Sequence, residues 1–570
     1  MTNQQIAKIL EEIADILEIQ GEIVFKVRAY QKAVETVSNL TKEISTMMEE
    51  ELRELPGIGE AIAKKVHTLA TTGKLDYYEE LKKSEFAPLV DLLQIPSVGP
   101  KHARMLYERL GVKTVADLEK AAKEGKIKDL PGMGAKSEEN ILKGISALFR
   151  HKERIPLGQI LPKVEKIVEE LKKVKEVKNI ALAGSLRRMK ETIADGDVLV
   201  SANKAEPIME AFVTLPQVER VLSHGETKSS IITKDNFQVD LRVVKPESWG
   251  AALHYFTGSK SHNVKVRTLA VKKGLSVNEY GLWKGKKLLA SKTEEDMYKS
   301  LGLQWMPPEI REDWGEVELA AKKKIPRLIQ GEDIKGDLQM HTNWSDGRDT
   351  IEEMAKAAGD LGYEYIAITD HSPLVGITGG LEEKRVRKQI EEIKKVNRKF
   401  KNFRILSGIE VDIRGDGRLD LPDLVLKELD IVVATVHSRF NLPKEQMTKR
   451  IVKALENPVV DILGHPTGRL LGKRDPYEVD LDKVIDAALA NGKVLELNGS
   501  PDRLDLPDIW VRKAKDKGIK IAISTDSHRT EHLQEWMRYG VAYGRRGWLQ
   551  KEDVVNTLSL AKFLKFFKIK

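Results

Sequence analysis

The sequence of 570 residues contains no cysteine. This absence excludes disulfide bonds, cysteine-bound zinc, iron–sulfur clusters and thiol catalysis. Any metal ion must therefore be bound by His, Asp and Glu side chains, which suit Mg²⁺, Mn²⁺, or Zn²⁺ in a mixed site. The sequence also lacks an apolar run of the roughly 18 residues that a membrane span requires. Its first residues form an acidic amphipathic pattern instead of a signal peptide, so we expect a cytoplasmic protein without a membrane partner.

The net charge of +8 is modest, but it is unevenly distributed. Residues 101–190 contain 22 Lys and Arg against 12 Asp and Glu, and residues 251–290 contain 8 against 1. Residues 331–570 are nearly balanced, with 41 against 39. Local surpluses of this kind commonly contact phosphates, although solvated lysine-rich helix faces would explain them equally well.

The pattern of the chain changes twice along its length, and the length itself predicts about three to five domains. Residues 1–150 form a pattern typical of short amphipathic helices, and residues 155–314 mix strand-like runs with helices. The charged segment 322–335 carries Pro and Gly and is predicted to be a linker. After it, seven apolar strand candidates alternate with helical stretches, which predicts a parallel barrel. The lysine-rich end, 561–570, fits either a helix that covers the barrel or a DNA contact.

Most strands of the predicted barrel end in a possible metal ligand. These residues are His341, Asp346, Asp370, His371, Glu410, His437, His465, Asp526 and His528. A single His on a strand is more often packed or exposed, but five of the twelve histidines fall at this same topological position. Because a parallel barrel gathers the carboxyl ends of its strands at one face, they should converge. Two or three divalent ions bound there could ionise a water and stabilise a phosphoester displacement.

Residues 333–570 resemble the PHP (polymerase and histidinol phosphatase) family of metal-dependent phosphoesterases. The matching motifs are Gln339-Met340-His341, Ser345-Asp346-Gly347, Thr369-Asp370-His371, Glu410, His437, His465 and Asp526-Ser527-His528. The resemblance implies a distorted (βα)7 barrel that binds up to three Mn²⁺ or Zn²⁺ ions. Gln339 replaces an expected His. Since a neutral amide is a poor ligand for such metals, we expect one metal position to be weakened and the activity to be reduced.

Three aspartates in the middle of the chain are candidates for a second metal site. Asp195 and Asp197 are two residues apart beside an apolar run and would share one face of a strand. Two adjacent like charges are costly unless a cation lies between them, and Mg²⁺ favours one or two carboxylates with phosphate oxygens. Asp240 lies in the apolar run 237–244, where an unpaired carboxylate is expensive. The alternative is that these are ordinary turn and edge-strand aspartates.

The context of these aspartates favours nucleotidyl transfer. Gly184 and Ser185 form a turn at which a backbone N–H and a hydroxyl can approach a phosphate, and Arg187 and Arg188 supply charge. Residues 253–267, LHYFTGSKSHNVKVR, resemble the Tyr-Phe-Thr-Gly-Ser motif of family X DNA polymerases. The resemblance covers residues 1 to about 315, so the whole chain resembles bacterial family X DNA polymerases with a C-terminal PHP domain.

The resemblance implies roles for individual residues. Those implied in binding Mg²⁺ or Mn²⁺ and in catalysis are Asp195, Asp197 and Asp240, the last as the base that deprotonates the primer 3′-hydroxyl. Those implied in binding the dNTP and the nascent pair are Gly184, Ser185, Arg188, Tyr255, Phe256, Gly258 and Asn263. Arg267 is implied in template binding.

The N-terminal helices contain a turn of apolar–Pro–x–x–Gly three times, from Leu55, Ile95 and Leu130. A helix that begins at such a turn presents free backbone N–H groups to a phosphate, although three ordinary helix caps are the simpler alternative. The turns resemble the helix–hairpin–helix motif, which implies DNA binding at Gly57, Gly59, Gly99, Gly132 and Gly134. The middle copy has Ser97 where the first Gly is usual.

The first 80 residues or so resemble the lyase domain of the same family. Lys65 matches its Schiff-base lysine, and Lys26 and Tyr30 match positions near a 5′-phosphate pocket. The alternative is that Lys65 only contacts a DNA phosphate, from the helix that follows the first glycine turn.

We therefore expect six divisions: a lyase-like helical domain (1–85), a helical DNA-binding subdomain (86–155), a nucleotidyltransferase palm (156–250), a nucleotide- and nascent-pair-binding subdomain (251–318), a linker (319–334) and a PHP barrel (335–570). The expected function is a monomeric, cytoplasmic bacterial DNA polymerase that fills short gaps in base excision repair, with a 3′–5′ exonuclease or phosphoesterase. Its partners would be gapped or primer–template DNA and dNTPs. The alternatives are a nuclease or phosphatase whose N-terminal half only binds DNA, and a non-catalytic scaffold that binds DNA ends.

Overall fold

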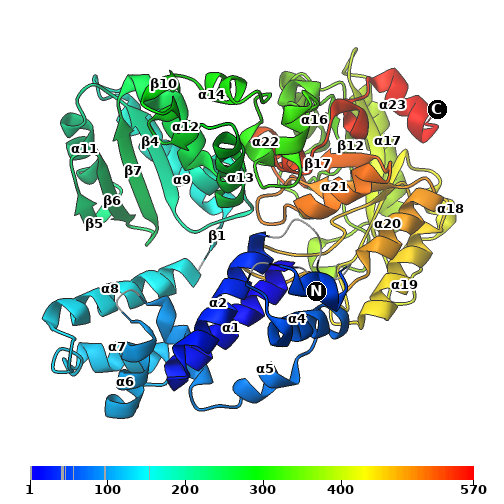
Figure 1. Cartoon of the computed structure of the whole chain (residues 1–570). Helices are drawn as coiled ribbons and strands as arrows, with labels where there is room; N and C mark the ends of the chain where they lie inside the picture. Colours follow the sequence, from blue (N-terminus) through cyan, green and yellow to red (C-terminus); the bar gives the residue numbers. More distant parts are fainter. Residues whose placement is uncertain are drawn as a thin grey trace. The chain divides into compact units, whose positions relative to one another are not determined.

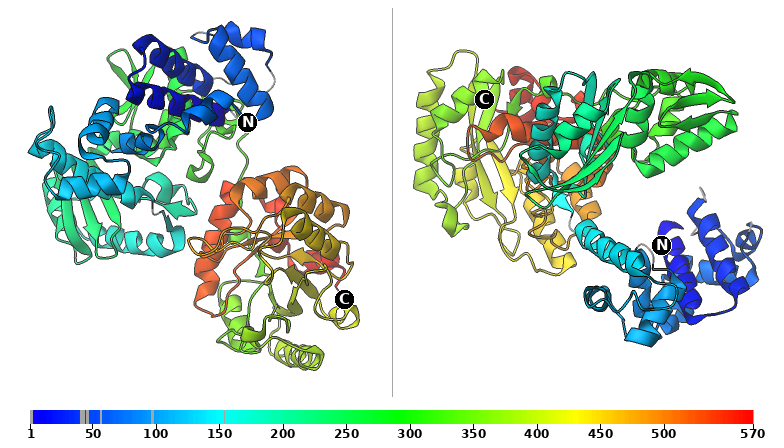
Figure 2. Two further views of the ribbon diagram at one scale, coloured as in Figure 1. Left: turned by 90° about the horizontal axis from the view of Figure 1, so that it is seen from below. Right: turned by 90° about the vertical axis from the view of Figure 1, so that its left-hand side faces the viewer.

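Two compact units make up the chain. The computed structural model describes residues 3–39, 44, 47–55, 57–95, 98–152 and 154–569. Residues 1–154 form the first unit and residues 155–570 form the second (Figures 1 and 2). Within these described ranges, no helix has both the length and the apolar character needed to cross a membrane.

The first unit is helical. Its elements are α1 (Asn3–Gln20), α2 (Val24–Asn39), α3 (Glu49–Arg53), α4 (Glu60–Thr72), α5 (Asp76–Leu81), the 3₁₀ helix η2 (Ala87–Gln94), α6 (Pro100–Leu110), α7 (Val115–Lys123) and α8 (Ala135–Lys152). Apolar residues recur at helical spacing in α1, as Ile6, Leu10, Ile13 and Leu17, and all four are buried. They pack with α2 and α4 in one core, whereas η2 and α6–α8 contribute to a second core around Leu106.

The second unit begins with a mixed five-stranded sheet in the order β2-β4-β7-β6-β5. The elements of this part are β1 (Ile155–Pro156), α9 (Leu157–Lys172), β2 (Asn179–Leu182), α10 (Gly184–Arg187), β3 (Thr192–Ile193), β4 (Gly196–Ser201), α11 (Glu206–Val213), β5 (Val218–His224), β6 (Lys228–Thr233) and β7 (Gln238–Val244). Along β7, Val239, Leu241 and Val243 are buried in a core shared with α9 and α11. Because side chains alternate along a strand, Asp240 lies on the other face of the sheet.

Helices and a small antiparallel sheet follow. These elements are η3 (Pro246–Ser248), α12 (Trp249–Thr257), α13 (Lys260–Lys272), β8 (Ser276–Asn278), β9 (Gly281–Lys284), β10 (Lys287–Ala290), α14 (Glu294–Ser300), η4 (Pro308–Ile310) and α15 (Glu316–Ala321). The segment 319–334, which we expected to be a linker, is not an exposed connection. Leu328 and Ile329 are buried, and the Ile329 N–H donates to the Leu549 carbonyl at 2.8 Å. The segment is rich in charge, but its apolar residues pack inward.

The rest of the second unit is a barrel of seven parallel strands in sequence order, β11 to β17. Its elements are η5 (Gly331–Asp333), β11 (Gly336–Asp337), α16 (Ile351–Asp360), β12 (Tyr365–Ile368), η6 (Gly376–Thr378), α17 (Glu383–Asn397), β13 (Arg404–Asp412), α18 (Asp423–Leu426), β14 (Ile431–Thr435), α19 (Lys444–Leu455), β15 (Ile462–Leu463), α20 (Leu481–Ala490), β16 (Val494–Asn498), α21 (Asp508–Asp516), β17 (Ile521–Ser524), α22 (His532–Arg546), η7 (Lys551–Asp553), η8 (Val555–Thr557) and α23 (Leu560–Phe567). A parallel bridge between Met340 and Ser527 joins the segments that follow the first strand and the last. The predicted seven-stranded barrel is confirmed.

The C-terminal segment packs on the barrel. Phe563 of α23 is buried, and its ring centroid lies 4.4 Å from that of Tyr365 on β12. It belongs to a core with Leu338, Leu406 and Val494 from other strands. Of the two alternatives for this lysine-rich end, the structure therefore supports the helix that covers the barrel (Figure 1).

Candidate active sites

The sheet of the second unit brings two of the three predicted aspartates side by side. β4 and β7 are neighbouring parallel strands, and their register pairs Asp197 with Asp240. Asp195 lies in the bend just before β4. Asp240 accepts hydrogen bonds or ion-pair contacts from Gln238 Nε2 at 2.8 Å and Lys228 Nζ at 3.2 Å.

The acidic cluster is electrostatically unfavourable by itself. Burial and the nearby Asp195 and Asp240 carboxylates raise the pKa of Asp197 to about 7, against the opposing effect of Lys228 and Arg188. Like charges at this separation are relieved by a divalent cation, and three carboxylates suit Mg²⁺ or Mn²⁺. The residues therefore fit a metal site.

Gly184 closes one side of this cluster. It begins α10 with φ +54°, and a Cβ built on it would overlap Oδ2 of Asp197. Only glycine allows the backbone to lie against the carboxylate in this conformation. Beside the two carboxylates is a small cavity lined by Ala183, Asp197, Val198, Leu199, Lys228, Asp240, Leu241, Arg242 and Phe256.

The two arginines after this turn have different partners. Arg187 donates to both carboxylate oxygens of the buried Glu294, at 2.8 Å each, and is held in the core of the following subdomain. Arg188 donates from Nε to Glu312 Oε1 at 3.0 Å and from Nη1 to the Thr257 carbonyl at 2.5 Å. Arg188 thus joins the Gly184 turn to the end of α12.

The residues of the predicted nucleotide pocket lie on α12 and α13. Tyr255 and Phe256 are half-buried with ring centroids 5.1 Å apart, and the Arg242 guanidinium lies 4.6 Å from the Phe256 ring. Asn263 donates to the Tyr255 carbonyl at 2.7 Å, while its Oδ1 is buried without a hydrogen-bond partner in the described chain. Gly258 has φ +69° at the end of α12, and Arg267 is exposed on α13.

The predicted phosphate clamps begin helices. Gly59 and Gly99 are the N-terminal caps of α4 and α6, and Gly134 directly precedes α8. A Cβ on any of these three would meet no atom within 4 Å, so open space lies beside each. Gly57 and Gly132 have φ of +82° and +76°. Ser97, the departure in the middle copy, lies outside the described residues.

Lys65 of α4 lies in an aromatic pocket of the first unit. It donates a hydrogen bond to the Tyr30 hydroxyl, and its Nζ lies 3.9 Å from the centroid of the Tyr77 ring. Lys26 Nζ lies 5.9 Å from the Tyr77 centroid. Burial, together with the positive charge of Lys26, lowers the pKa of Lys65. A larger neutral fraction makes an amine a better nucleophile.

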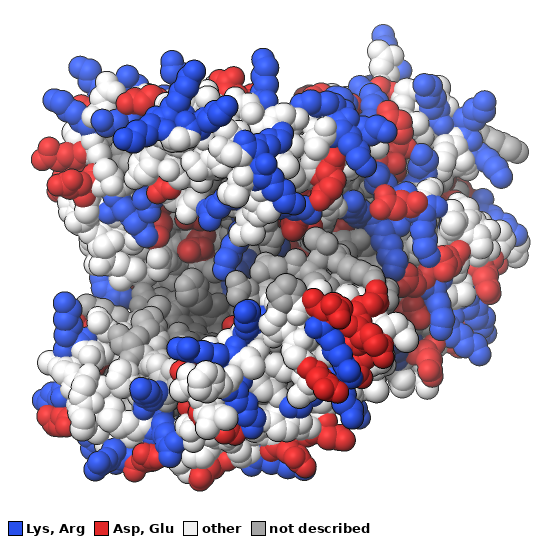
Figure 3. All heavy atoms as spheres, viewed as in Figure 1, with Lys and Arg blue, Asp and Glu red and all other residues white. Residues whose placement is uncertain are grey.

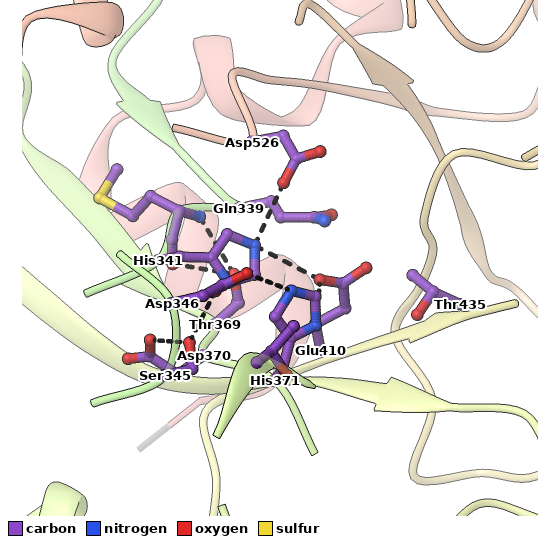
Figure 4. Close-up of polar contacts among 12 residues, drawn as sticks. Gln339, His341, Ser345, Asp346, Thr369, Asp370, His371, Glu410, Thr435 and Asp526 are labelled. Atoms are coloured by element: carbon purple, nitrogen blue, oxygen red, sulfur yellow. Dashed lines mark hydrogen bonds and ion pairs between the residues drawn. The ribbon is translucent and has the colours of Figure 1, made fainter. Parts of the chain in front are cut away.

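The barrel gathers its predicted ligands at one end, and Figure 4 shows His341, Asp346, His371, Glu410 and Asp526 among them. Three groups have ligand atoms that all lie within 4.8 Å of one another: His341, Asp346, His371 and His528; His371, Glu410 and His437; and His341, Glu410 and Asp526. His465 belongs to none of these groups, but its Nε2 lies 2.9 Å from Glu410 Oε1. Eight of the nine candidate ligands are thus in one cluster, and Asp370 is the exception.

The cluster fits several cations. Nδ1 of His371 and Oε2 of Glu410 lie 3.1 Å apart, yet neither buried atom has a hydrogen-bond partner in the described chain. Two ligands aimed at a common cation would have this arrangement. Burial lowers the pKa of His371 to about 4, which keeps its imidazole in the neutral form that metals bind. Although burial opposes it, His371 and His437 hold the pKa of Glu410 well below its usual range.

Gln339 stands where the motif has His. Its side chain is fully buried, and neither Nε2 nor Oε1 has a hydrogen-bond partner among the described residues. In the view of Figure 4 its amide lies between Asp526 and Glu410. A buried, unsatisfied amide at the edge of a ligand cluster fits a position built for a metal ligand.

Asp370 is a correction to the predicted ligands. Its carboxylate accepts hydrogen bonds from the Thr342 backbone N–H at 2.8 Å, the Ser345 hydroxyl at 2.5 Å and Gln389 Nε2 at 2.6 Å. These bonds turn it away from the three ligand groups and hold the loop that carries Asp346. A strand-end carboxylate next to a ligand histidine looks the same in sequence whether it binds a metal or a loop.

Sequence reasoning missed two residues that support the cluster. Asp412 accepts from the His437 N–H at 3.1 Å, and its Oδ2 lies 3.4 Å from His437 Nδ1. Arg503 donates to Asp526 Oδ2 at 3.1 Å. Asp412 had a signal, because it is two residues from Glu410 and shares its strand face. Arg503 lies in a loop and had none.

Basic side chains gather outside these sites. Figure 3 shows Lys and Arg over the upper left part of the second unit, where Figure 1 places β10, α12 and α14. Exposed lysines of this part are Lys272, Lys284, Lys286, Lys287 and Lys292. The surplus of residues 251–290 therefore lies at the surface, as much on the β9–β10 hairpin as on α13.

The second unit thus combines an acidic nucleotidyltransferase-type site with a His/carboxylate barrel site. Matches to known families lie in both units. They are a helix-hairpin-helix domain (1–75), a SAM-like helix-hairpin-helix tandem (89–147), a DNA polymerase beta thumb (252–312) and a PHP domain (337–500).

Relatives match both the whole chain and the barrel alone. The DNA polymerase/3′-5′ exonuclease PolX of Bacillus subtilis is 39% identical over 572 residues, which cover 100% of each chain. Probable phosphatases of Caldanaerobacter subterraneus subsp. tengcongensis and Thermoanaerobacter sp. are 34% and 36% identical over 189 residues, 31% of this chain and 70% and 72% of theirs. The chain belongs to the family X DNA polymerases with a C-terminal PHP domain.

Proposed function

We propose that this chain is a template-directed DNA polymerase that fills short gaps in base excision repair, and that its PHP barrel acts on 3′ ends as a 3′–5′ exonuclease or phosphoesterase. The observation that carries the polymerase activity is the parallel pairing that sets Asp197 beside Asp240, next to Asp195 and the Gly184 turn. We expect it to act as a monomer on gapped or primer–template DNA and dNTPs, in the cytoplasm of a bacterium.

In the polymerase site, Asp195, Asp197 and Asp240 would hold Mg²⁺ or Mn²⁺ ions, which stabilise the negative charge of an in-line phosphoryl displacement when bound. Asp240 takes the proton of the primer 3′-hydroxyl. Ser185 and Arg188 hold the β- and γ-phosphates of the dNTP.

The neighbouring helices orient the nucleotide and the DNA. Tyr255 and Phe256 line the sugar and discourage a 2′-hydroxyl. The Asn263 side chain reaches the minor-groove edge of the nascent pair, and Arg267 contacts the template strand. The glycine turns of the first unit hold DNA phosphates without regard to sequence.

In the barrel, up to three Mn²⁺ or Zn²⁺ ions would be held by the eight clustered residues and would supply a nucleophilic water when bound. Gln339 leaves one ligand position with a poor donor, so the hydrolytic activity is reduced. Asp412 and Arg503 orient His437 and Asp526.

Primer extension on DNA with a one-nucleotide gap, in Mg²⁺ or Mn²⁺, tests the polymerase activity. The parent should insert one nucleotide. Asp240→Ala should extend the primer roughly 10²–10⁴-fold more slowly, as expected when a general base that is also a metal ligand is removed. Asp235→Ala is the matched control, since Asp235 lies on the same hairpin, half-exposed and paired with Lys163. A parent without extension, or an active Asp240→Ala, would instead favour a nuclease whose N-terminal half only binds DNA.

A second activity, removal of a 5′-deoxyribose phosphate, is favoured by the Lys65 pocket. The lowered pKa of Lys65 and its position between Tyr30 and Tyr77 suit Schiff-base formation. Borohydride should trap a covalent DNA adduct with the parent and with Lys64→Ala, an exposed neighbour on α4, but not with Lys65→Ala. Absence of an adduct with the parent would leave Lys65 as a phosphate contact only.

A further inference from the structure

One helix of the barrel extends from one candidate site to the other. His528 lies in the loop that follows β17. α22 begins four residues later, at His532, and ends at Arg546. Its fifteen residues span about 22 Å. Its first turns therefore adjoin the barrel ligands Asp526 and His528, and its last residue reaches the nucleotidyltransferase part.

Arg546 is almost completely buried, with 1% of its side chain exposed. Nε and Nη2 contact Asp508 Oδ2 at 2.8 and 2.7 Å, which fixes the guanidinium to the first residue of α21. Nη1 points the other way. It donates to the backbone carbonyl of Arg188 at 2.7 Å and lies 3.1 Å from Glu312 Oε1.

The Glu312 oxygen is shared between two arginines. Oε1 accepts from Arg188 Nε at 3.0 Å as well as from Arg546. Glu312 is 8% exposed, and although burial opposes it, Arg188 and Arg546 lower the pKa of Glu312. The carboxylate therefore stays ionised between the two guanidiniums.

Two separate groups of Arg188 thus depend on Arg546: its carbonyl directly and its Nε through Glu312. We propose that Arg546, a residue of the PHP barrel, is a positioning residue for the triphosphate site, because it sets the place and direction of the Arg188 side chain. This inference rests on the proposed function, in which Arg188 holds the phosphates of the dNTP.

Arg546→Lys tests the proposal with little change in charge or volume. A lysine ammonium cannot contact Asp508 with two nitrogens and donate to the Arg188 carbonyl at the same time. We expect the KM for dNTP in gap filling to rise at least fivefold, with the KM for gapped DNA and the thermal unfolding midpoint nearly unchanged. Glu312→Gln keeps an acceptor oxygen but removes the negative charge that holds both guanidiniums, and it should raise the dNTP KM in the same direction.

The matched control is Arg538→Lys. Arg538 lies on the same helix and makes an ion pair with Glu165 of α9. It therefore also joins the barrel to the preceding part of the second unit, but without contacting Arg188. It should leave the dNTP KM unchanged. Because Arg546 acts through Arg188, adding Arg546→Lys to Arg188→Lys should raise the KM no further.

The outcomes separate the two ideas. If the parent extends primers and Arg546→Lys binds dNTP as the parent does, or if its effect multiplies that of Arg188→Lys, the positioning role is wrong and the proposed function stands. If the dNTP KM rises equally in Arg538→Lys, general loosening of the packing around α22 would explain the effect. The positioning role would then be wrong as well. If the parent extends no primer, the proposed function fails and this inference fails with it.

Discussion

Gly184 places the backbone of its turn directly against the Asp197 carboxylate. Its positive φ and the overlap that a Cβ would make with Oδ2 both require glycine. The two requirements can be separated, because Gly274 also has a positive φ, +68°, with no atom within 4 Å of its Cβ position.

We predict that Gly184→Ala lowers kcat/KM for gap filling by about 100-fold, as expected when a catalytic group is displaced by about 1 Å. Gly274→Ala carries only the backbone cost, about 1–2 kcal/mol, and should keep nearly full activity. Steady-state kinetics with both purified variants, alongside their circular dichroism spectra, would check this. Equal losses would mean that backbone strain, and not the Asp197 contact, is the cause.

Gln339 is the residue at which the barrel departs from its family motif. We predict that Gln339→His increases the number of Mn²⁺ ions retained by the protein and raises 3′–5′ degradation by about tenfold or more, the scale on which ligand environment affects metal sites. Gln446→His, on the exposed face of α19, is the control for an added imidazole. Metal content by mass spectrometry and release of 3′ nucleotides are the two measurements. Unchanged values in both would show that Gln339 does not weaken the cluster.

At the scale of the elements, sequence patterns identified the strands that are buried. All seven barrel strands, and the individual strands β4 and β7, were predicted from apolar runs, whereas the pairing of β4 with β7 was not. β5 was not predicted, since six of its seven residues are exposed and it shows no alternation. Strands β8–β10 were not either, because each has only three or four residues, too few to show a periodic pattern. Asp370 shows the same limit within a site: the motif places it at the right strand end, but only the contacts of Thr342 and Ser345 show what it binds.

α23 is an element whose role composition left open. Because Phe563 is buried against Tyr365 and Phe566 is 41% exposed, the two phenylalanines form a matched pair. We predict that Phe563→Ala destabilises the barrel by about 3–5 kcal/mol, whereas Phe566→Ala changes its stability by only about 0.5 kcal/mol. Thermal unfolding followed by tryptophan fluorescence would measure both. Similar midpoints for the two variants would argue against packing of α23 on the barrel.

At the scale of the whole molecule, the chain carries two candidate sites, the acidic cluster around Asp197 and the His/carboxylate cluster of the barrel. No single stretch of sequence contains all the residues of either site. Residues 188 and 546 are 358 positions apart, and no sequence motif indicates that they touch. The contact comes from the fold, since α22 packs on β17 and β16 and also against η4 of the preceding subdomain. Long-range contacts of this kind decide how one site affects another, and they are the part of the molecule that sequence patterns do not reach.

Charge distribution is also a property of the whole molecule, and it predicts where DNA binds. Replacing Lys284, Lys286 and Lys287 on the β9–β10 hairpin with Gln should weaken binding of gapped DNA and flatten its salt dependence, by about 0.9 in the logarithmic slope for each phosphate that is no longer neutralised. The same change at Lys384, Lys388 and Lys395 of α17, also exposed, removes equal charge from the nearly balanced barrel and should leave the slope as it is. Fluorescence anisotropy between about 50 and 200 mM salt distinguishes the two. If both variants flatten the slope equally, DNA responds to the net charge of the protein and not to the hairpin, and the position of the basic surplus carries no information about the binding surface.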